Sequence, residues 1–215
     1  MTVARGSISW ILTTFILSCF FLILSASITA NISSAFLFIS FLLILLTGFF
    51  ILFFRDPERK IGKGIVAAAD GKIREISIIK DNEIGECTKI STFMNVYNVH
   101  VNRMPLDGTI KKIVHLSGAH LPAFKKESEG NERVIITINT EIGLVKIIQI
   151  AGTLARRIVP YVKKEDKLKK GEKIGIIRLG SRVDIYIPSN RIKTIHVKMG
   201  DIIKAGVNTI AEIND

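Results

Sequence analysis

Three polar residues far apart in the sequence have the types needed for a nucleophile, a base and a group that orients the base. Ser181 follows Gly180 between two β-prone runs, His100 lies in a run of alternating valine and polar residues, and Asp70 directly precedes Gly71. A serine hydroxyl becomes an effective nucleophile when a histidine takes its proton, and a carboxylate can hold that histidine in the correct tautomer. Each residue also has an ordinary interpretation, as a bulge, a half-exposed strand position or a turn former. Together they are consistent with an Asp–His–Ser triad, because the chain order of a triad varies between folds.

Motifs for other kinds of chemistry are absent from the sequence. It contains no Walker loop, no dinucleotide-binding fingerprint and no CxxC pair. The histidines are scattered without the spacing of metal ligands: His100, His115, His120 and His196. We therefore expect no metal site. Two cysteines, Cys19 and Cys87, are too few for a disulfide scaffold.

The elements that must position these residues are mainly β-strands. From residue 64 onward, short β-prone runs such as 72–78, 134–138 and 145–150 alternate with Gly, Asp, Asn and Pro. This spacing of turn signals predicts a barrel or sandwich with short helical pieces. The fold class expected is mainly β, with a barrel-sandwich-like domain.

Weak internal repetition supports that expectation. Residues 70–76 echo residues 107–113, and residues 166–171 echo residues 201–206 with the shared pattern Asp-x-x-Lys-x-Gly. Each echo reads as a strand–turn–strand unit in which the glycine supplies a positive φ. The echoes are interpreted either as repeats of a barrel-sandwich fold or as ordinary hairpins, since hairpins draw on few turn sequences.

The first quarter of the chain has the composition of a membrane hairpin. No charged residue occurs between Arg5 and Arg55, which leaves room for two spanning helices near 9–30 and 35–54 with a turn at 31–34. Residues 1–54 are therefore expected to anchor residues 55–215. Positive charges on both outer flanks place both ends on the cytoplasmic side of a cell membrane. The alternative is a cleaved signal peptide with its cleavage region at 25–30.

The charge of the chain points to a membrane surface rather than to nucleic acid. The formal net charge is +11 at pH 7, and nearly all of the charged residues follow the apolar segment. A basic domain beside a membrane is attracted to anionic headgroups. The sequence shows no basic helix and few aromatic residues for base stacking, so nucleic acid is not expected as a partner.

The chain resembles the phosphatidylserine decarboxylase family, in its short form with a membrane hairpin. The resemblance rests on motifs that run in order from residue 54 to near the C-terminus: FRDPER (54–59), ADGK (69–72), FMNVYNVHVNR (93–103), NER (131–133), IAGTLARRI (150–158) and LGSRVDIYIP (179–188). The N-terminal hairpin matches only in character.

The resemblance implies that the protein makes its own cofactor from Ser181. The Ser181 hydroxyl would attack the carbonyl of Gly180, and an ester formed by an N→O shift would undergo β-elimination. The products would be a large chain, 1–180, and a small chain, 181–215, which begins with a pyruvoyl group and stays with the large chain as a heterodimer. His100 would act as general base and acid, and Asp70 would orient it.

The resemblance also implies a phospholipid substrate. The amine of a serine headgroup would form a Schiff base with the pyruvoyl carbonyl, and loss of CO2 would convert phosphatidylserine or archaetidylserine to the ethanolamine lipid. Arg103 stands where longer members of the family have a second histidine. It is interpreted either as a contact to the substrate phosphate or carboxylate, or as part of a structural salt bridge.

Other functions fit parts of the sequence. A non-enzymatic, membrane-tethered scaffold or adaptor would need no cleavage and would use the echoes only as structural repeats. A lipoyl or biotinyl carrier would need an isolated lysine at a hairpin tip, which the sequence does not show. A membrane-anchored serine protease would use the same three residues, but Ser181 lies inside a strand-like run near the C-terminus.

Overall fold

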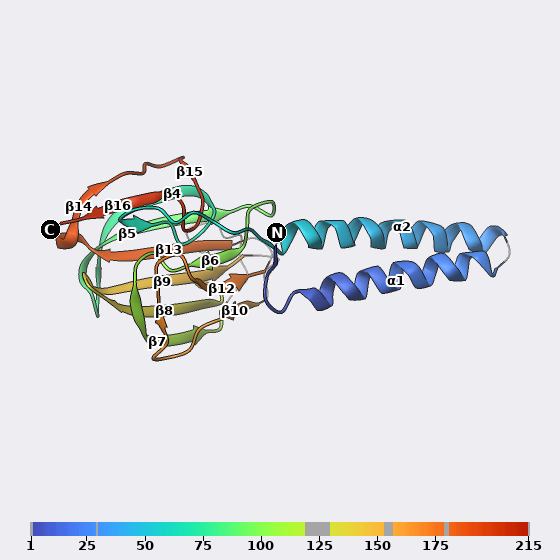
Figure 1. The fold of residues 1–215 in the computed structure, drawn as a ribbon, viewed down its shortest axis with the longest axis horizontal. Helices are drawn as coiled ribbons and strands as arrows, with labels where there is room; N and C mark the ends of the chain where they lie inside the picture. Colours follow the sequence, from blue (N-terminus) through green and yellow to red (C-terminus); the bar gives the residue numbers. More distant parts are fainter. Residues whose placement is uncertain (1, 29, 119–129, 153–156, 179–180, 215) are drawn as a thin grey trace. The chain divides into compact units, whose positions relative to one another are not determined.

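The computed structural model describes residues 2–28, 30–118, 130–152, 157–178 and 181–214 (Figure 1). The chain divides into two compact units, Met1–Glu58 and Arg59–Asp215. The boundary follows Glu58 rather than residue 54, because β2 (Arg55–Asp56) pairs with β1 (Thr2–Val3) at the start of the chain.

The first unit is a hairpin of two apolar helices. Helix α1 (Ile8–Ala26) and helix α2 (Ala30–Phe53) are both long and apolar enough to cross a membrane. Large apolar side chains are exposed along both helices, among them Ile23 and Phe38. Such a surface is stable in lipid and costly in water, which indicates membrane association.

The turn of this hairpin comes earlier than the sequence predicts. It lies between Ala26 and Ala30, so residues 31–34 belong to the first turns of α2. Ser33 explains part of the difference, because its hydroxyl donates to the carbonyl of Ser25 at 2.8 Å. A polar residue that appeared to break the apolar run instead joins the two helices.

Hydroxyl side chains line the contact between α1 and α2. Ser18 and Ser40 each donate to the other's carbonyl oxygen at 2.9 Å, and Thr47 donates to the hydroxyl of Thr14 at 2.8 Å. Ser33, Ser40 and Thr47 follow one another at heptad spacing. Small hydroxyl residues let helix backbones approach closely in a membrane and supply hydrogen bonds between them.

The described residues of the second unit form three antiparallel sheets. The largest has eight strands in the order β11-β7-β8-β9-β13-β5-β4-β15, and the smaller sheets have the orders β10-β12-β6 and β14-β16-β3 (Figure 1). The bounds are β3 (Ile65–Val66), β4 (Gly71–Asp81), β5 (Gly85–Met94), β6 (Val101–Arg103), β7 (Gly108–Leu116), β8 (Arg133–Thr140), β9 (Gly143–Ala151), β10 (Ile158–Pro160), β11 (Lys167–Leu168), β12 (Lys173–Ile177), β13 (Ser181–Pro188), β14 (Ile192–Ile195), β15 (Ile202–Ile203) and β16 (Thr209–Ile213). A short 3-10 helix, η2 (Ser189–Arg191), follows β13. The expectation of a mainly β domain preceded by a two-helix hairpin is confirmed.

The eight-stranded sheet curls so that one end reaches over its middle. Lys146 on β9 contacts Asp81 at the tip of the β4–β5 hairpin at 2.8 Å and Glu83 at 2.7 Å. Strands β13 and β5 lie between β9 and β4 in the sheet order, so this contact requires strong curvature. The curvature helps to bury charged residues on this face, including the Arg182–Asp184 pair.

The sequence echoes occupy equivalent positions at the two ends of this sheet. Strand β15 pairs with β4 through Ile203 and Gly71, and β11 pairs with β7 through Leu168 and Gly108, in the same relative register. Each short unit ends on a glycine of positive φ, 84° at Gly171 and 74° at Gly206. The echoes are therefore structural repeats rather than unrelated hairpins.

An aspartate supports each repeat in the same way. The carboxylate of Asp70 accepts from the backbone N–H of Ala205 at 2.8 Å, and the carboxylate of Asp107 accepts from that of Lys170 at 2.7 Å. The two contacts are equivalent, because the echoes align Asp70 with Asp107 and Ala205 with Lys170. They give Asp70 a structural role that the sequence did not reveal.

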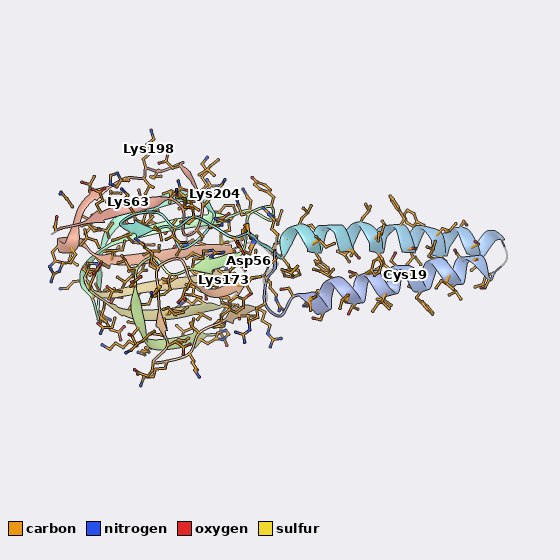
Figure 2. All side chains as sticks on the ribbon, viewed as in Figure 1. Cys19, Asp56, Lys63, Lys173, Lys198 and Lys204 are labelled. Carbon is orange, nitrogen blue, oxygen red and sulfur yellow. The ribbon has the colours of Figure 1, made fainter. Side chains whose placement is uncertain are left out.

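The core of the β unit is rich in isoleucine and valine. Along β13, Val183, Ile185 and Ile187 point into the core and are nearly or fully buried. Side chains alternate along a strand, so Ser181 lies on this same face at the strand's first position. Charged residues such as Lys63, Lys198 and Lys204 are exposed on the outside of the unit (Figure 2).

Candidate active site

Ser181 begins a central strand of the eight-stranded sheet. It pairs with Met94 at the end of β5 and with Ala151 at the end of β9. The residue is 0% exposed, and its hydroxyl contacts the sulfur of Met94 at 3.4 Å. Gly180, the other half of the predicted cleavage site, lies outside the described residues. The sheet thus holds Ser181 from both sides at a point where the chain enters it.

His100 is buried close to the chain that leads into Ser181. It precedes β6, is 0% exposed, and its carbonyl oxygen accepts from the N–H of Ile177 at 3.4 Å. Its ring nitrogen Nδ1 lies 2.9 Å from the carbonyl oxygen of Asn98. A carbonyl oxygen can only accept, so Nδ1 carries a proton and Nε2 is the basic nitrogen of the neutral ring. The Asn98 carbonyl therefore selects the tautomer that general-base chemistry needs.

Two buried amide side chains lie beside this pair. The Nδ2 of Asn102 contacts the same Met94 sulfur at 3.7 Å, and the Nε2 of Gln149 donates to the Oδ1 of Asn102 at 2.7 Å. Both amides are 0% exposed. Their hydrogen bond connects β6 to β9, and Asn102 contacts the same sulfur atom as the Ser181 hydroxyl. The run of alternating valine and polar residues that contains His100 also contains Asn102, but the sequence analysis missed Gln149, whose only signal is a polar residue between two isoleucines.

The structure brings the His100 and Ser181 segments together without a hydrogen bond between the two side chains. Within the described residues, the hydrogen-bond partner of the Ser181 hydroxyl is Met94, not His100. Catalytic hydrogen bonds are often long in unliganded proteins and tighten in the reacting complex. Proton transfer between His100 and Ser181 therefore stays a prediction.

Asp70 has partners other than His100. Its two carboxylate oxygens accept from the guanidinium of Arg59 at 2.6 and 2.8 Å, and Oδ1 also accepts from Ala205. His100 is not among the hydrogen-bond partners of Asp70 in the described part of the chain. Arg59, which the sequence analysis included in the FRDPER motif without giving it a role, is thus the direct partner of a predicted site residue.

Arg103 lies at the far end of β6 from His100. It pairs in register with Lys173 at the start of β12, and its Nη1 donates to the carbonyl of Gly171 at 3.0 Å. The side chain is buried and borders a cavity of about 500 Å³ together with Ile61, Leu168, Lys170, Gly171, Glu172 and Lys173, the last labelled in Figure 2. The contact with Gly171 is to a backbone carbonyl and not to a carboxylate. Both interpretations of Arg103, a contact with substrate and a salt bridge, stay predictions.

A second cavity lies on the opposite face of β13 from Ser181. It has a volume of about 160 Å³ and is lined by Arg133, Ile148, Ile150, Arg182, Asp184 and Tyr186. The alternation of side chains along β13 separates these residues from Ser181. Neither this cavity nor the one beside Arg103 includes Ser181 or His100 among its described lining residues.

Comparison with known proteins assigns the family. Residues 46–211 match the family model described as phosphatidylserine decarboxylase. The chain is 48% identical over 159 residues to the phosphatidylserine decarboxylase proenzyme of Streptomyces avermitilis, covering 74% of this chain and 71% of that protein.

Two archaeal relatives match the chain almost end to end. A protein of Methanococcoides burtonii assigned as an archaetidylserine decarboxylase proenzyme is 42% identical over 212 residues, covering 97% of this chain and 95% of the relative. A protein of Methanosarcina barkeri with the same assignment is 40% identical over 213 residues, covering 98% of each. The resemblance read from the motifs is confirmed, and so is the expectation of an enzyme rather than a scaffold. The chain belongs to the phosphatidylserine decarboxylase family and is a carboxy-lyase of the proenzyme type.

Proposed function

We propose that the chain cuts itself between Gly180 and Ser181 and then decarboxylates the serine headgroup of a phospholipid to the ethanolamine lipid and CO2. The observation that carries this proposal is the position of Ser181, buried at the start of a central strand and beside the His100 segment. His100 has its basic nitrogen set by the carbonyl of Asn98.

The cut requires one base and no other protein. His100 Nε2 takes the proton of the Ser181 hydroxyl, and the oxygen attacks the carbonyl carbon of Gly180. The C–N bond breaks as the C–O bond forms, and the nitrogen of residue 181 receives the proton. Removal of the Cα proton of residue 181 then expels Gly180 as a carboxylate, with cleavage of the Cβ–Oγ bond. Water hydrolyses the remaining dehydroalanine to a pyruvoyl group and ammonia.

The sheet would hold the two products together. The cut falls immediately before β13, whose pairing with β5 and β9 does not depend on residue 180. The small chain also supplies β15, which pairs with β4, and β16, which pairs with β3. We therefore propose that the large and small chains remain a heterodimer after cleavage.

The surroundings of residue 181 fit a pyruvoyl group. A pyruvoyl group at this place would supply the carbonyl that takes the substrate amine and accepts the electron pair left by CO2. The buried His100 would hold the proton that returns to carbon. Asn102 and Gln149 would exclude water and keep the residue oriented, because their mutual hydrogen bond joins two sheets behind it.

The substrate proposed is phosphatidylserine or archaetidylserine. Support for a lipid comes from the apolar hairpin, whose outward side chains suit a bilayer. Support for the archaeal lipid comes from archaeal relatives that match nearly the whole chain and whose names include archaetidylserine. Arg5 and Arg55 flank the hairpin on both sides, so the catalytic unit would lie at the cytoplasmic face of the membrane.

Intact mass of the purified protein tests the proposal directly. The wild type should give chains 1–180 and 181–215, the second with a ketone in place of its N-terminal amine, and should release CO2 from a serine phospholipid. Diacyl and archaeal ether substrates assayed side by side would identify the preferred lipid.

Two variants assign the roles in cutting. Ser181→Ala should remain one chain and release no CO2, because it lacks the hydroxyl from which the cofactor is made. His100→Ala should also stay uncut. Decarboxylation by uncut Ser181→Ala would refute the mechanism, and normal cutting of His100→Ala would remove this residue from the processing step.

A further inference from the structure

Two arginines face one another across the strands that approach Ser181. Strands β10 and β12 are antiparallel, with Ile158 opposite Ile177. The next position continues this pairing, because the N–H of Arg178 donates to the carbonyl oxygen of Arg157 at 3.3 Å. Residues directly opposite in an antiparallel pair have adjacent side chains. Arg157 and Arg178 therefore form a cross-strand pair of like charge.

The arginine pair lies within reach of the reacting residue. Arg178 precedes Ser181 by three residues, and three residues span at most about 10 Å. Arg157 follows Ala151, which pairs directly with Ser181, so the chain leaves the sheet beside Ser181 and returns beside Arg178. The N–H of Ile177, next to Arg178, binds the carbonyl of His100.

The two positive charges work against each other in the absence of an anion. Burial and the nearby charge of Arg157 lower the pKa of Arg178, and the nearby Tyr161 partly offsets them. In the described part of the chain, no acidic residue forms an ion pair with Arg157, whose side chain is exposed. Like charges placed directly opposite in a sheet are destabilising, and an anion bound between them would relieve the repulsion.

We propose that Arg157 and Arg178 bind the phosphodiester of the serine phospholipid during decarboxylation. Two guanidinium groups match the oxygens of a phosphate well, because each can donate parallel hydrogen bonds. The carboxylate of the substrate is the poorer ligand for this pair. Strong binding of the carboxylate would stabilise the charge that must be lost as CO2 and would slow the reaction. The site deepens the proposed function and rests on it.

The test compares two soluble substrates of the cut wild-type enzyme and its variants. One is dihexanoyl phosphatidylserine below its micelle concentration, and the other is an O-alkylserine, which has the same amine and carboxylate but an ether in place of the phosphodiester. We expect Arg157→Gln to lower the ratio of kcat/KM between the first and second substrates about tenfold, mainly through KM, because a charge-assisted hydrogen bond to phosphate is lost. Arg157→Lys should restore part of the ratio, and Arg178→Lys should lower it less than Arg157→Gln.

A matched control and a second ligand complete the design. Arg191→Gln removes an exposed arginine just beyond the opposite end of β13 and should keep the wild-type ratio. Inorganic phosphate should inhibit wild type competitively against the phosphodiester substrate and should inhibit Arg157→Gln less.

The possible outcomes separate the inference from the proposed function. A wild type that stays uncut, or that decarboxylates neither substrate, overturns both. A cut, active enzyme whose ratio is unaltered by Arg157→Gln and Arg178→Lys overturns the inference alone. Loss of affinity for phosphatidylglycerol vesicles with an unaltered ratio on the soluble substrates would mean that the pair binds a neighbouring lipid, and would also overturn it.

Discussion

At the scale of single residues, Asp70 makes two kinds of contact. One, with Ala205, recurs in the other repeat, and the other, with Arg59, does not. The hydrogen bond from Ala205 has a counterpart between Lys170 and Asp107 in the other repeat, so it belongs to the architecture. Among the described residues, the bidentate pair with Arg59 has no counterpart at Asp107, although Arg59 also donates to the carbonyl of Ala205 at 3.1 Å. To stabilise protonated His100, the Asp70 carboxylate would have to leave the Arg59 guanidinium or bind both groups at once.

The internal repeat supplies a matched control for the role of Asp70. Substitution of either aspartate by asparagine keeps an oxygen for the backbone N–H and removes the negative charge. If Asp70 acts on His100, Asp70→Asn should slow the cut at least about tenfold, because the charge that stabilises the imidazolium is lost. Asp107→Asn should cut at the wild-type rate. The measurement is the time course of cleavage by intact mass from freshly synthesised protein.

Arg59→Gln distinguishes the two contacts of Asp70. It leaves the Asp70 charge in place without its guanidinium partner, so cutting should be slowed less than in Asp70→Asn. The contrary outcome is that cutting is slowed in Asp70→Asn, Asp107→Asn and Arg59→Gln alike, each only in proportion to the stability it loses. Asp70 would then do no more than support the repeat.

At the scale of elements, the helix hairpin is held by hydroxyl groups rather than by apolar packing alone. Apolar contact between helices gains little in a membrane, because lipid tails are as apolar as leucine. The reciprocal hydrogen bonds of Ser18 and Ser40 are therefore specific to the pairing of α1 with α2.

A double-mutant cycle measures this pairing. Ser18→Ala, Ser40→Ala and the double variant should show a coupling free energy of about 0.6 kcal/mol, the typical value for such bonds in membrane proteins. Unfolding in mixed detergent micelles provides the measurement. Ser34→Ala, at an exposed position of α2, serves as the control and should show no coupling with Ser18→Ala.

A second element, the β4–β5 hairpin, is tied to β9 by a charge cluster with a definite pH dependence. Burial by itself would raise the pKa of Asp81, but hydrogen bonds from Lys146 and from the backbone of Glu83 and Ile84 outweigh it and lower the pKa. A carboxyl group whose pKa is lowered by folding adds stability above its unfolded pKa, and this stability is lost as pH falls through the folded value. The cluster therefore stabilises the curled sheet at neutral pH and not in acid.

Lys146→Met should flatten this dependence. The free energy of unfolding of the wild-type protein should decrease as pH falls below about 4, and that of Lys146→Met should decrease less over the same range, because the partner that lowers the pKa is gone. Urea unfolding at several pH values measures both slopes. Lys164→Met removes a lysine from an exposed pair with Glu165 and should keep the wild-type slope. Equal slopes in the wild type and Lys146→Met would contradict the assignment.

At the scale of the whole molecule, the orientation of the catalytic unit across the membrane can be read with one engineered cysteine. Cys87 is fully buried, and burial raises the pKa of its thiol, so it should not react. Cys19 lies in an apolar helix that a charged reagent does not enter. Lys198 projects from the surface of the β unit (Figure 2) and tolerates replacement.

Lys198→Cys should react with a membrane-impermeant maleimide only after the cells are opened. This follows from the positive charges that flank the hairpin, which favour the cytoplasmic side. Labelling in intact cells would place the catalytic unit outside and would contradict the proposed orientation. The unmodified protein provides the background.

The sequence by itself determined the broad organisation of the molecule. Two apolar helices, a mainly β unit and the internal echoes follow from local composition and periodicity, which decide what a segment can bury. The family followed from motifs around Ser181 and His100, because these motifs are short continuous stretches of sequence. The end of a helix is less certain by the same reasoning: Ser33 looked like part of a turn and instead joins α2 to α1.

Only the tertiary structure decided which polar groups meet. Asp70 binds Arg59, the carbonyl of Asn98 sets the ring of His100, and Arg157 lies opposite Arg178. A hydrogen bond or a charge contact depends on the register and curvature of strands that are distant in the sequence, whereas periodicity reports only which face of its own strand a side chain occupies.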